Sequence, residues 1–264
     1  MPETAGVKVL MYHWVDPDPG RNLREWGLVP EVFEAQMTAL AERGYKVLSL
    51  REVLQVVRGE RPASPGTVAL TFDDGYRGLL QHVLPVLERF RFRATFALVS
   101  DRMGGTNTWD ARHGDRPRAL MGWDEAATLA SRGMEIASHS RTHPFLTALS
   151  ESEQEDEIRG SKEIIEDRLG VPVRFFCYPH GLLDSRCRRL VASSGYEGAC
   201  SSRFGGNVPG TDPFLLRRSE ITYSDGAWSF SFKARTGFSL REWARERVTE
   251  LLPRLMPGPR GAAS

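Results

Sequence analysis

The stretch TVALTFDDGY, residues 67–76, joins a short apolar strand to an abruptly polar end. Its first six residues are rich in β-branched and aromatic side chains, which favours a buried strand. Asp73 and Asp74 follow, and Gly75 allows a sharp turn through which both carboxylates can face one opening. Parallel α/β proteins place their chemistry at the carboxyl ends of strands. A solvated turn that caps the next helix would use the same residues, so this stretch alone leaves a turn and a site both open.

Seven further apolar runs of similar length are spread along the chain and are separated by helical patterns. They are residues 7–13, 45–50, 93–99, 134–139, 174–179, 196–201 and 215–221. Between the runs, residues 30–44 open with a proline and close with a glycine, as helices do. Ser150 and Glu153 form a capping box for a helix that Gly170 ends. The alternation predicts an α/β protein, and the economical fold is a single distorted β/α barrel of about seven or eight mostly parallel strands. A doubly wound open sheet would give the same pattern.

No internal repeat and no Pro/Gly/Ser-rich linker divides the chain, so residues 1–252 are expected to form one domain. Residues 253–264 have the composition of a disordered tail. The polar, glycine-rich residues 101–122 are long for a connection and are expected to form a loop over one rim of the barrel.

Composition excludes several classes of protein. Of 264 residues, 41% are hydrophobic and 26% charged, which is typical of a globular protein. Lys and Arg total 35 against 34 Asp and Glu, so no strong field exists to attract nucleic acid. The three cysteines, an odd number without CxxC spacing, indicate reduced thiols. Together with the absence of a signal-peptide pattern and of a long apolar run, they predict a cytoplasmic protein.

An aromatic run, Trp228-Ser-Phe-Ser-Phe232, is followed by cationic residues. Its period-2 alternation favours an edge strand packed on the barrel. A peripheral contact with a membrane, where the chain would meet a lipid-linked sugar, is the alternative. In the polar loop, Trp109, Asp110 and His113 are candidates for lining a sugar site, although an aromatic loop residue more often packs locally.

His139 and His143 follow the strand-like run 134–139 at a spacing of four residues. If the segment turns helically, the two imidazoles reach one point, and imidazole suits zinc and related divalent ions. With the two carboxylates at another strand end, they form a candidate Asp-His-His site with an open position for water, as catalytic metal sites have. A second strand end carries Tyr178-Pro-His-Gly181, a rigid turn able to point a backbone N–H at a ligand.

These three motifs, in this order, resemble the polysaccharide deacetylases of carbohydrate esterase family 4. The resemblance runs from about Val7 to Ile221 and implies a distorted β/α barrel that removes acetyl from an N-acetylated sugar with the help of a metal. It implies that Asp74, His139 and His143 hold the metal and that Asp73 is the general base. The backbone around Pro179 and His180 would help to hold the oxyanion.

The sequence departs from the family pattern at two places. Cys177 stands where many members have an arginine that orients the base, and Arg174 is the nearest arginine in sequence. No histidine follows His180, so the usual carboxyl-terminal general acid is missing. Met11-Tyr12-His13 instead resembles a circularly permuted subgroup, the biofilm-type N-acetylglucosamine polymer deacetylases, in which that histidine lies near the amino terminus.

His13 closes a strand-like run, which would put it on the same rim as Asp73 and make it the candidate general acid. An imidazole with a pKa of about 6.5 can supply a proton at neutral pH. His113 and His180 are rivals because both lie in loops, and a structural role for His13 is the alternative.

The sequence therefore predicts a metal-dependent hydrolase that removes acetyl from an N-acetylated amino sugar in exopolysaccharide or cell-envelope glycan biosynthesis, with a lipid-linked sugar as one form of the substrate. One divalent ion is expected, Zn²⁺ first, with Co²⁺, Ni²⁺, Fe²⁺ or Mn²⁺ as alternatives. Hydrolysis of a non-sugar amide or an O-acetyl ester at the same site is a second hypothesis. An inactive glycan-binding module is a third, but such a module needs no base beside a metal triad.

Overall fold

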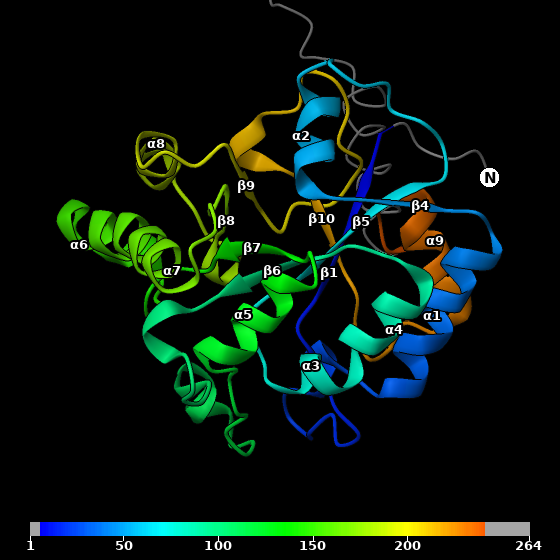
Figure 1. The fold of residues 1–264 in the computed structure, drawn as a ribbon, viewed down its shortest axis with the longest axis horizontal. Coiled ribbons are helices and arrows are strands. Elements are labelled where there is room, and N and C mark those ends of the chain that lie inside the picture. Colours follow the sequence, from blue (N-terminus) through cyan, green and yellow to red (C-terminus); the bar gives the residue numbers. More distant parts are fainter. Residues whose placement is uncertain (1–5, 241–264) are drawn as a thin grey trace, which may run out of the picture.

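The computed structural model describes residues 6–240, and its eight principal strands are surrounded by helices (Figure 1). The strands are β1 (Lys8–Tyr12), β4 (Lys46–Leu48), β5 (Thr67–Phe72), β6 (Thr95–Leu98), β7 (Glu135–Ser138), β8 (Phe175–Cys177), β9 (Gly198–Cys200) and β10 (Arg218–Glu220). The helices are α1 (Pro30–Glu42), α2 (Leu50–Val57), α3 (Gly78–His82), α4 (Leu84–Phe90), α5 (Trp123–Ser131), α6 (Glu151–Glu155), α7 (Ser161–Leu169), α8 (Ser185–Ser193) and α9 (Ala227–Thr236). A two-stranded sheet, β2 (Trp14–Val15) and β3 (Gly27–Leu28), lies apart from the main one.

The main sheet is a nearly closed parallel barrel. Its strand order is β10-β1-β5-β6-β7-β8-β9, and every pairing in it is parallel. A parallel bridge between Cys200 and Leu216 brings the chain just before β10 back to β9 and so almost closes the ring. Short β4 pairs with the first half of β5, on the edge whose second half β6 occupies. The predicted distorted β/α barrel is confirmed, and the eight predicted strand runs each contain one of these strands.

Alternation along each strand separates the barrel interior from the layer beneath the helices. Large side chains such as Leu70, Phe72 and Phe96 belong to the main apolar cluster that packs under the helices. The alternate positions carry mostly smaller side chains, which form a second cluster inside the barrel with Phe175 as a large exception; the small ones include Val9, Ala69, Ala97, Ala137, Cys177 and Cys200. Because side chains of a strand alternate between its two faces, Thr71 and Asp73 continue the inward face of Ala69.

Helix α2 closes the amino-terminal end of the barrel. Ser49 and Glu52 form a capping box that starts it. The Leu50 N–H donates to the carboxylate of Glu135, the first residue of β7. Buried α2 side chains, Leu54 among them, join the small interior residues of the strands in one cluster. The opposite end, where the strands finish, is left to the loops that form the site.

Two regions of the sequence have outcomes that bear on the site. Residues 228–232 lie in helix α9, so the predicted edge strand is wrong: Gly226 begins the helix, Gly237 ends it, and Trp228 stacks on Phe232 one turn later at 5.5 Å. The polar residues 101–122 form a loop with two short 3₁₀ turns before α5, as expected. The predicted tail, residues 253–264, and the end of the predicted domain lie outside the described residues.

Within residues 6–240, no helix combines the length and the apolar character needed to cross a membrane. The cysteines Cys177, Cys187 and Cys200 are buried free thiols.

Truncating Leu54 tests the closure of the barrel by α2. Leu54→Ala should lower the free energy of unfolding by about 2–5 kcal/mol, since a buried leucine leaves a cavity when it is shortened. The neighbouring Gln55 is exposed on the same helix, so Gln55→Ala should change stability by less than about 0.5 kcal/mol. Urea unfolding followed by circular dichroism measures both values, and equal values would show that α2 is not part of the core.

Candidate active site

A cavity of about 430 Å³ lies where the barrel strands end. It is lined by residues that directly follow or end several strands, together with the loop over the rim; they include His13, Asp73, Asp74, His139, Tyr178, His180, Glu220, Trp109, Asp110 and His113. The catalytic and metal residues predicted from sequence thus converge here, because the carboxyl ends of parallel strands meet at one end of a barrel. Pro179 is buried in the turn beside the cavity.

Asp74, His139 and His143 are the candidate metal ligands. Each offers one ligand atom, and these atoms lie within 4.8 Å of one another. Nε2 of His139 and Nε2 of His143 lie 3.2 and 3.3 Å from Oδ1 of Asp74, and all three side chains are buried. The backbone turns sharply to achieve this, since Asp74 has a φ of 70° and His143 a φ of 65°. Left-handed non-glycine residues are uncommon and gather at functional sites.

The segment between the two histidines is an irregular turn, so the helical geometry suggested for this pair is wrong. The Glu157 carboxylate holds the turn by accepting hydrogen bonds from the N–H groups of Arg141 and Thr142 at 2.8 and 2.9 Å and from the Thr142 hydroxyl at 2.6 Å. Glu157 itself lies in a π-helical turn, Asp156–Gly160, between α6 and α7. Such turns are frequent at functional sites.

The hydrogen bonding of His139 suits a metal ligand. Its Nδ1 lies 2.8 Å from the carbonyl oxygen of Cys177. A carbonyl can only accept, so Nδ1 carries a proton, and when the ring is neutral its Nε2 has a lone pair available for a metal. Oδ1 of Asp74 is buried without a hydrogen-bond partner among the described residues. A cation between these atoms would satisfy both, so the residues fit a divalent ion.

The electrostatics of the three residues agree with this fit. Burial lowers the pKa of His143 to about 3, so its ring is neutral at neutral pH. Burial also acts to raise the pKa of Asp74, but the two histidines lower it overall. For His139, burial acts to lower the pKa while Asp73 and Asp74 raise it overall, so a proton and a metal compete for Nε2. Metal affinity should therefore fall as the pH falls.

Aromatic rings surround His143 on the open side of the site. Trp109 stacks on its ring with centroids 4.4 Å apart, and His180 contacts its edge at the same distance. Phe145 stacks in turn on His180 at 4.0 Å. Trp109 therefore packs against a candidate metal ligand rather than standing free in the loop, and the loop 101–122 reaches the candidate metal site.

The turn Tyr178-Pro179-His180-Gly181 is rigid. His180 has a φ of 57° and Gly181 a φ of 66°, and a Cβ on Gly181 would lie 2.4 Å from the Ser202 hydroxyl. The Tyr178 N–H donates to Cys200 and the Gly181 N–H to Tyr178. Pro179 has no N–H to donate. The oxyanion role of this turn stays a prediction.

Arg218 on β10 is the functional residue that the sequence analysis missed. Nη1 and Nη2 donate to Oδ1 and Oδ2 of Asp73 at 2.7 and 2.8 Å, a two-point contact in which both side chains are buried. Nε donates to the carbonyl of Ser201 at 3.0 Å. Burial acts to raise the pKa of Asp73, but the Arg218 charge brings it below its ordinary value, so the carboxylate stays ionised. A signal was present, since two adjacent arginines in the run 215–221 force one of them toward the barrel interior.

Arg218 also explains the departure at Cys177. Its Nη1 lies 3.6 Å from the Cys177 sulfur, so the guanidinium reaches across from β10 and occupies the space beside this small side chain. Arg174, the arginine nearest in sequence, instead pairs with Glu197 at 2.8 Å through a partly exposed side chain.

His13 lies at the rim of the cavity at the end of β1. Its side chain is 16% exposed, and Nδ1 lies 4.0 Å from Oε1 of Glu220. His82 lies at the end of α3 and lines a different cavity, so it is not part of this site. His113 and His180 share the cavity with His13, so the assignment of His13 as the acid stays a prediction.

The fold and this site define a hydrolase-type barrel, and comparison with known proteins gives its family. The sequence profile described as polysaccharide deacetylase matches residues 60–199, so the chain belongs to that family. The Bacillus subtilis protein YxkH is 25% identical over 219 residues, which cover 83% of this chain and 72% of YxkH. The poly-β-1,6-N-acetyl-D-glucosamine N-deacetylase of Escherichia coli K12 is 28% identical over 139 residues, which cover 51% of this chain but only 20% of that enzyme.

Solved structures agree with the fold. IcaB from Ammonifex degensii aligns with a TM-score of 0.73 at 20% identity, over 88% of this chain and 97% of that one. The Streptococcus pyogenes deacetylase PplD, solved in complex with acetate, aligns with a TM-score of 0.71 at 22% identity, over 84% and 94%. The biofilm-type likeness is thus borne out in fold, while the circular permutation stays a prediction of the sequence.

Metal analysis tests the candidate ligands. The purified chain loaded with Zn²⁺ should hold about one ion, and His139→Ala and His143→Ala together should remove most of it, because two of three ligand atoms are lost. His82→Ala is the matched control and should keep full occupancy. Mass spectrometry of the bound metal after gel filtration measures all three, and full occupancy in the double variant would rule this site out.

Proposed function

We propose that the chain is a metal-dependent carbohydrate deacetylase that hydrolyses the acetamide of an N-acetylated amino sugar. The observation that carries the proposal is a buried carboxylate, Asp73, held ionised directly beside a cluster of three residues that fit a divalent ion. A glycan-binding module has no use for such a base. The family membership and the N-deacetylase named among the relatives support the same reaction.

Asp74, His139 and His143 would hold the ion, with Zn²⁺ the first expectation. Bound there, a divalent ion lowers the pKa of a coordinated water and polarises the acetyl carbonyl. The chain itself supplies the fixed ligand geometry, through the Glu157 turn and the hydrogen bond between His139 and Cys177. The aromatic contact of Trp109 with His143 limits the movement of that ligand.

Asp73 acts as the general base that takes the proton of the attacking water. Arg218 is a positioning residue: its two-point contact fixes the carboxylate plane, and its charge keeps the carboxylate ionised. An arginine that binds a base tightly also makes that base weaker, so the pair trades basicity for orientation.

His13 acts as the general acid that protonates the leaving nitrogen. An amide nitrogen leaves poorly without a proton, so the acid must reach the side of the substrate opposite the base. His13 and Asp73 come from the ends of the paired strands β1 and β5, and Glu220 faces Nδ1 of His13 from β10. The backbone of the turn at Pro179 and His180 is proposed to help hold the oxyanion.

The names of the relatives support the proposed substrate class. Relatives include poly-β-1,6-N-acetyl-D-glucosamine N-deacetylases of Escherichia coli and Staphylococcus epidermidis, which supports a role in exopolysaccharide or cell-envelope glycan biosynthesis. An O-acetyl ester or a non-sugar amide is the second candidate, since the same groups would hydrolyse either. Acetate release from matched N-acetylated and O-acetylated oligosaccharides and from a non-sugar acetamide decides among them, and no acetate from any of the three would leave only a binding role.

Asp73→Asn should abolish turnover while keeping the metal, because the amide retains the shape but cannot accept the water's proton. Loss of about 10²–10⁴-fold in kcat is expected, the usual range for general acid–base catalysis. Metal mass spectrometry and acetate release are measured on the same sample. Release of the metal by Asp73→Asn would mean that Asp73, rather than Asp74, is a ligand.

The pH profile tests Arg218 as a positioning residue. Its charge lowers the pKa of Asp73, so in Arg218→Met this pKa should rise and the acidic limb of kcat/KM should move to higher pH. Arg218→Lys keeps the charge and should keep the limb near its original position while kcat falls. Arg217→Met changes the exposed neighbour and is the control. A merely structural arginine would lower the amount of folded enzyme without moving the limb.

His13→Ala should slow an N-acetyl substrate by about 10²–10⁴-fold. An activated ester of equal size needs no protonation of its leaving group and should suffer far less. His113→Ala and His180→Ala are assayed beside it. Equal losses on both substrates, or none, would remove His13 from the role, and the differential loss in one of the other variants would assign the acid there.

A further inference from the structure

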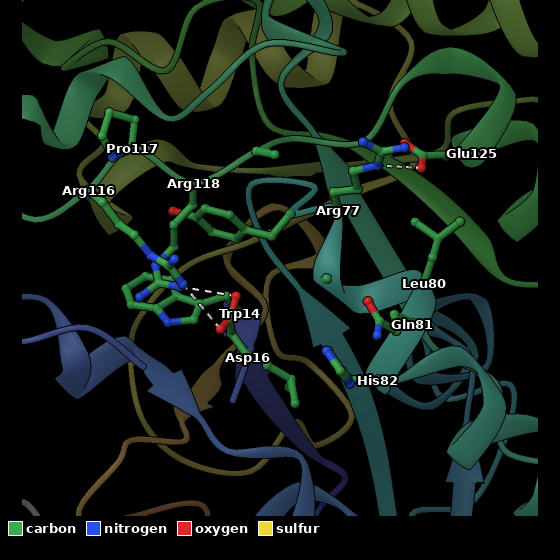
Figure 2. A pocket seen from close by; sticks show the side chains of 14 residues that line it. Trp14, Asp16, Arg77, Leu80, Gln81, His82, Arg116, Pro117, Arg118 and Glu125 are labelled. Atoms are coloured by element: carbon green, nitrogen blue, oxygen red, sulfur yellow. Dashed lines mark hydrogen bonds and ion pairs between the residues drawn. The ribbon is translucent and has the colours of Figure 1, made fainter. Parts of the chain in front are cut away.

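A second cavity, of about 590 Å³, adjoins the catalytic cavity. Trp14 and Tyr76 line both cavities, and both side chains are buried, so they form the wall between them. Trp14 directly follows His13, and Tyr76 closes the motif that carries Asp73 and Asp74. The second cavity lies between the loop 116–119 and helix α3, and its lining is mostly polar (Figure 2).

Two guanidinium groups meet on one side of this cavity. Figure 2 shows Arg116 and Arg118 converging on the carboxylate of Asp16. Nη2 of Arg116 lies 3.5 Å from one oxygen and Nη1 of Arg118 lies 3.5 Å from the other. Both distances exceed the 2.7–2.9 Å typical of charge-assisted hydrogen bonds. One carboxylate therefore serves two cations, and neither contact is tight.

Arg118 is held in place but incompletely satisfied. Its side chain is only 6% exposed, and its guanidinium stacks over the Trp14 ring at 4.5 Å. Nη2 donates to the carbonyl of Asp18 at 3.1 Å, whereas Nη1 is buried without a hydrogen-bond partner among the described residues. A buried cation with an unsatisfied donor is costly unless an anion completes its coordination.

The charge balance of the lining favours an anionic ligand. Arg77 is neutralised by Glu125, with Nε 2.7 Å from Oε1. Arg116 and Arg118 then share Asp16, which leaves one excess positive charge among the lining residues. Asp18 lies 3.3 Å from Arg116 but does not line the cavity, and because both side chains are more than half exposed, water screens that pair. Gln81 and His82 add further polar groups on the α3 side.

We infer that this second cavity binds an anionic oxygen group, a carboxylate or a phosphate, carried by the substrate next to the sugar that is deacetylated. That the anionic group belongs to the substrate rests on the proposed function, but anion binding in this cavity does not depend on turnover. Guanidinium groups recognise the planar or tetrahedral oxygens of such groups with paired donors. The substrate would then be an acidic glycan or a phosphate-linked sugar rather than a neutral polymer.

Calorimetric titration of the metal-loaded protein with inorganic phosphate, D-glucuronate and D-glucose tests the inference. Phosphate or glucuronate should bind and glucose should not. The anion that binds more tightly shows whether the site prefers a phosphate or a carboxylate. Arg116→Gln should weaken anion binding about tenfold or more, because it removes a charged donor. Asp16→Asn should strengthen it about fivefold, because the competing carboxylate is lost while the acceptor for the Asp18 N–H is kept.

Arg132→Gln is the matched control. Arg132 is 59% exposed, as Arg116 is, and pairs with Glu88 instead of lining the cavity. Anion binding retained in full by Arg116→Gln would place the anion at the metal or elsewhere and overturn the inference, as would glucose binding as tightly as glucuronate. The titration needs no acetate release, so an inactive enzyme that binds anions would refute the proposed function alone.

Discussion

The buried contact between Arg218 and Asp73 organises the interior of this barrel. Its strands carry small residues on their inner faces, which leaves room for one long cationic side chain that reaches from β10 to the end of β5. Burying a lone charge would cost several kcal/mol, and removing one partner of a buried pair typically costs about 3–5 kcal/mol. Replacing either residue should therefore destabilise the ring of strands without necessarily unfolding it, and the pair links the stability of the barrel to the ionised state of the base.

The same alternation that turns Arg218 inward sets the rest of the catalytic geometry. Val9 pairs with Arg218 and Met11 with Glu220 in the β1–β10 register. Residues two apart on a strand share a face, so His13 continues the inner face of Met11 and Asp73 continues the inner face of Thr71. The candidate acid and base thus lie at the same height on neighbouring strands, and Glu220 reaches His13 from the next strand. A shift of one residue in either register would turn these side chains outward.

Loops complete the site and extend it beyond the chemistry. The loop 101–122 brings Trp109 against His143 and carries Arg116 and Arg118 to the second cavity. One segment therefore contacts the candidate metal ligand and supplies the excess positive charge beyond the Trp14–Tyr76 wall. In the proposed assignment, the strand ends carry the chemistry and the long loop contributes to the selection of the substrate.

The sequence by itself determined the parallel α/β pattern and the candidate site residues Asp73, Asp74, His139 and His143 at or near the strand ends. These signals are local: short apolar runs, capping residues and motif spacing. Local patterns gave the wrong secondary structure at two places. Residues 228–232 have period-2 aromatics but lie on a helix that Gly226 and Gly237 delimit. The segment between the two histidines is not helical, because Glu157 from another element holds it in a turn. By contrast, the contacts of Arg218 with Asp73 and of Arg118 with Asp16 join residues that lie 145 and 102 positions apart in the chain. Only the tertiary structure decided these pairs, because a side chain's charge partner is set by the register and closure of the barrel rather than by its neighbours in sequence.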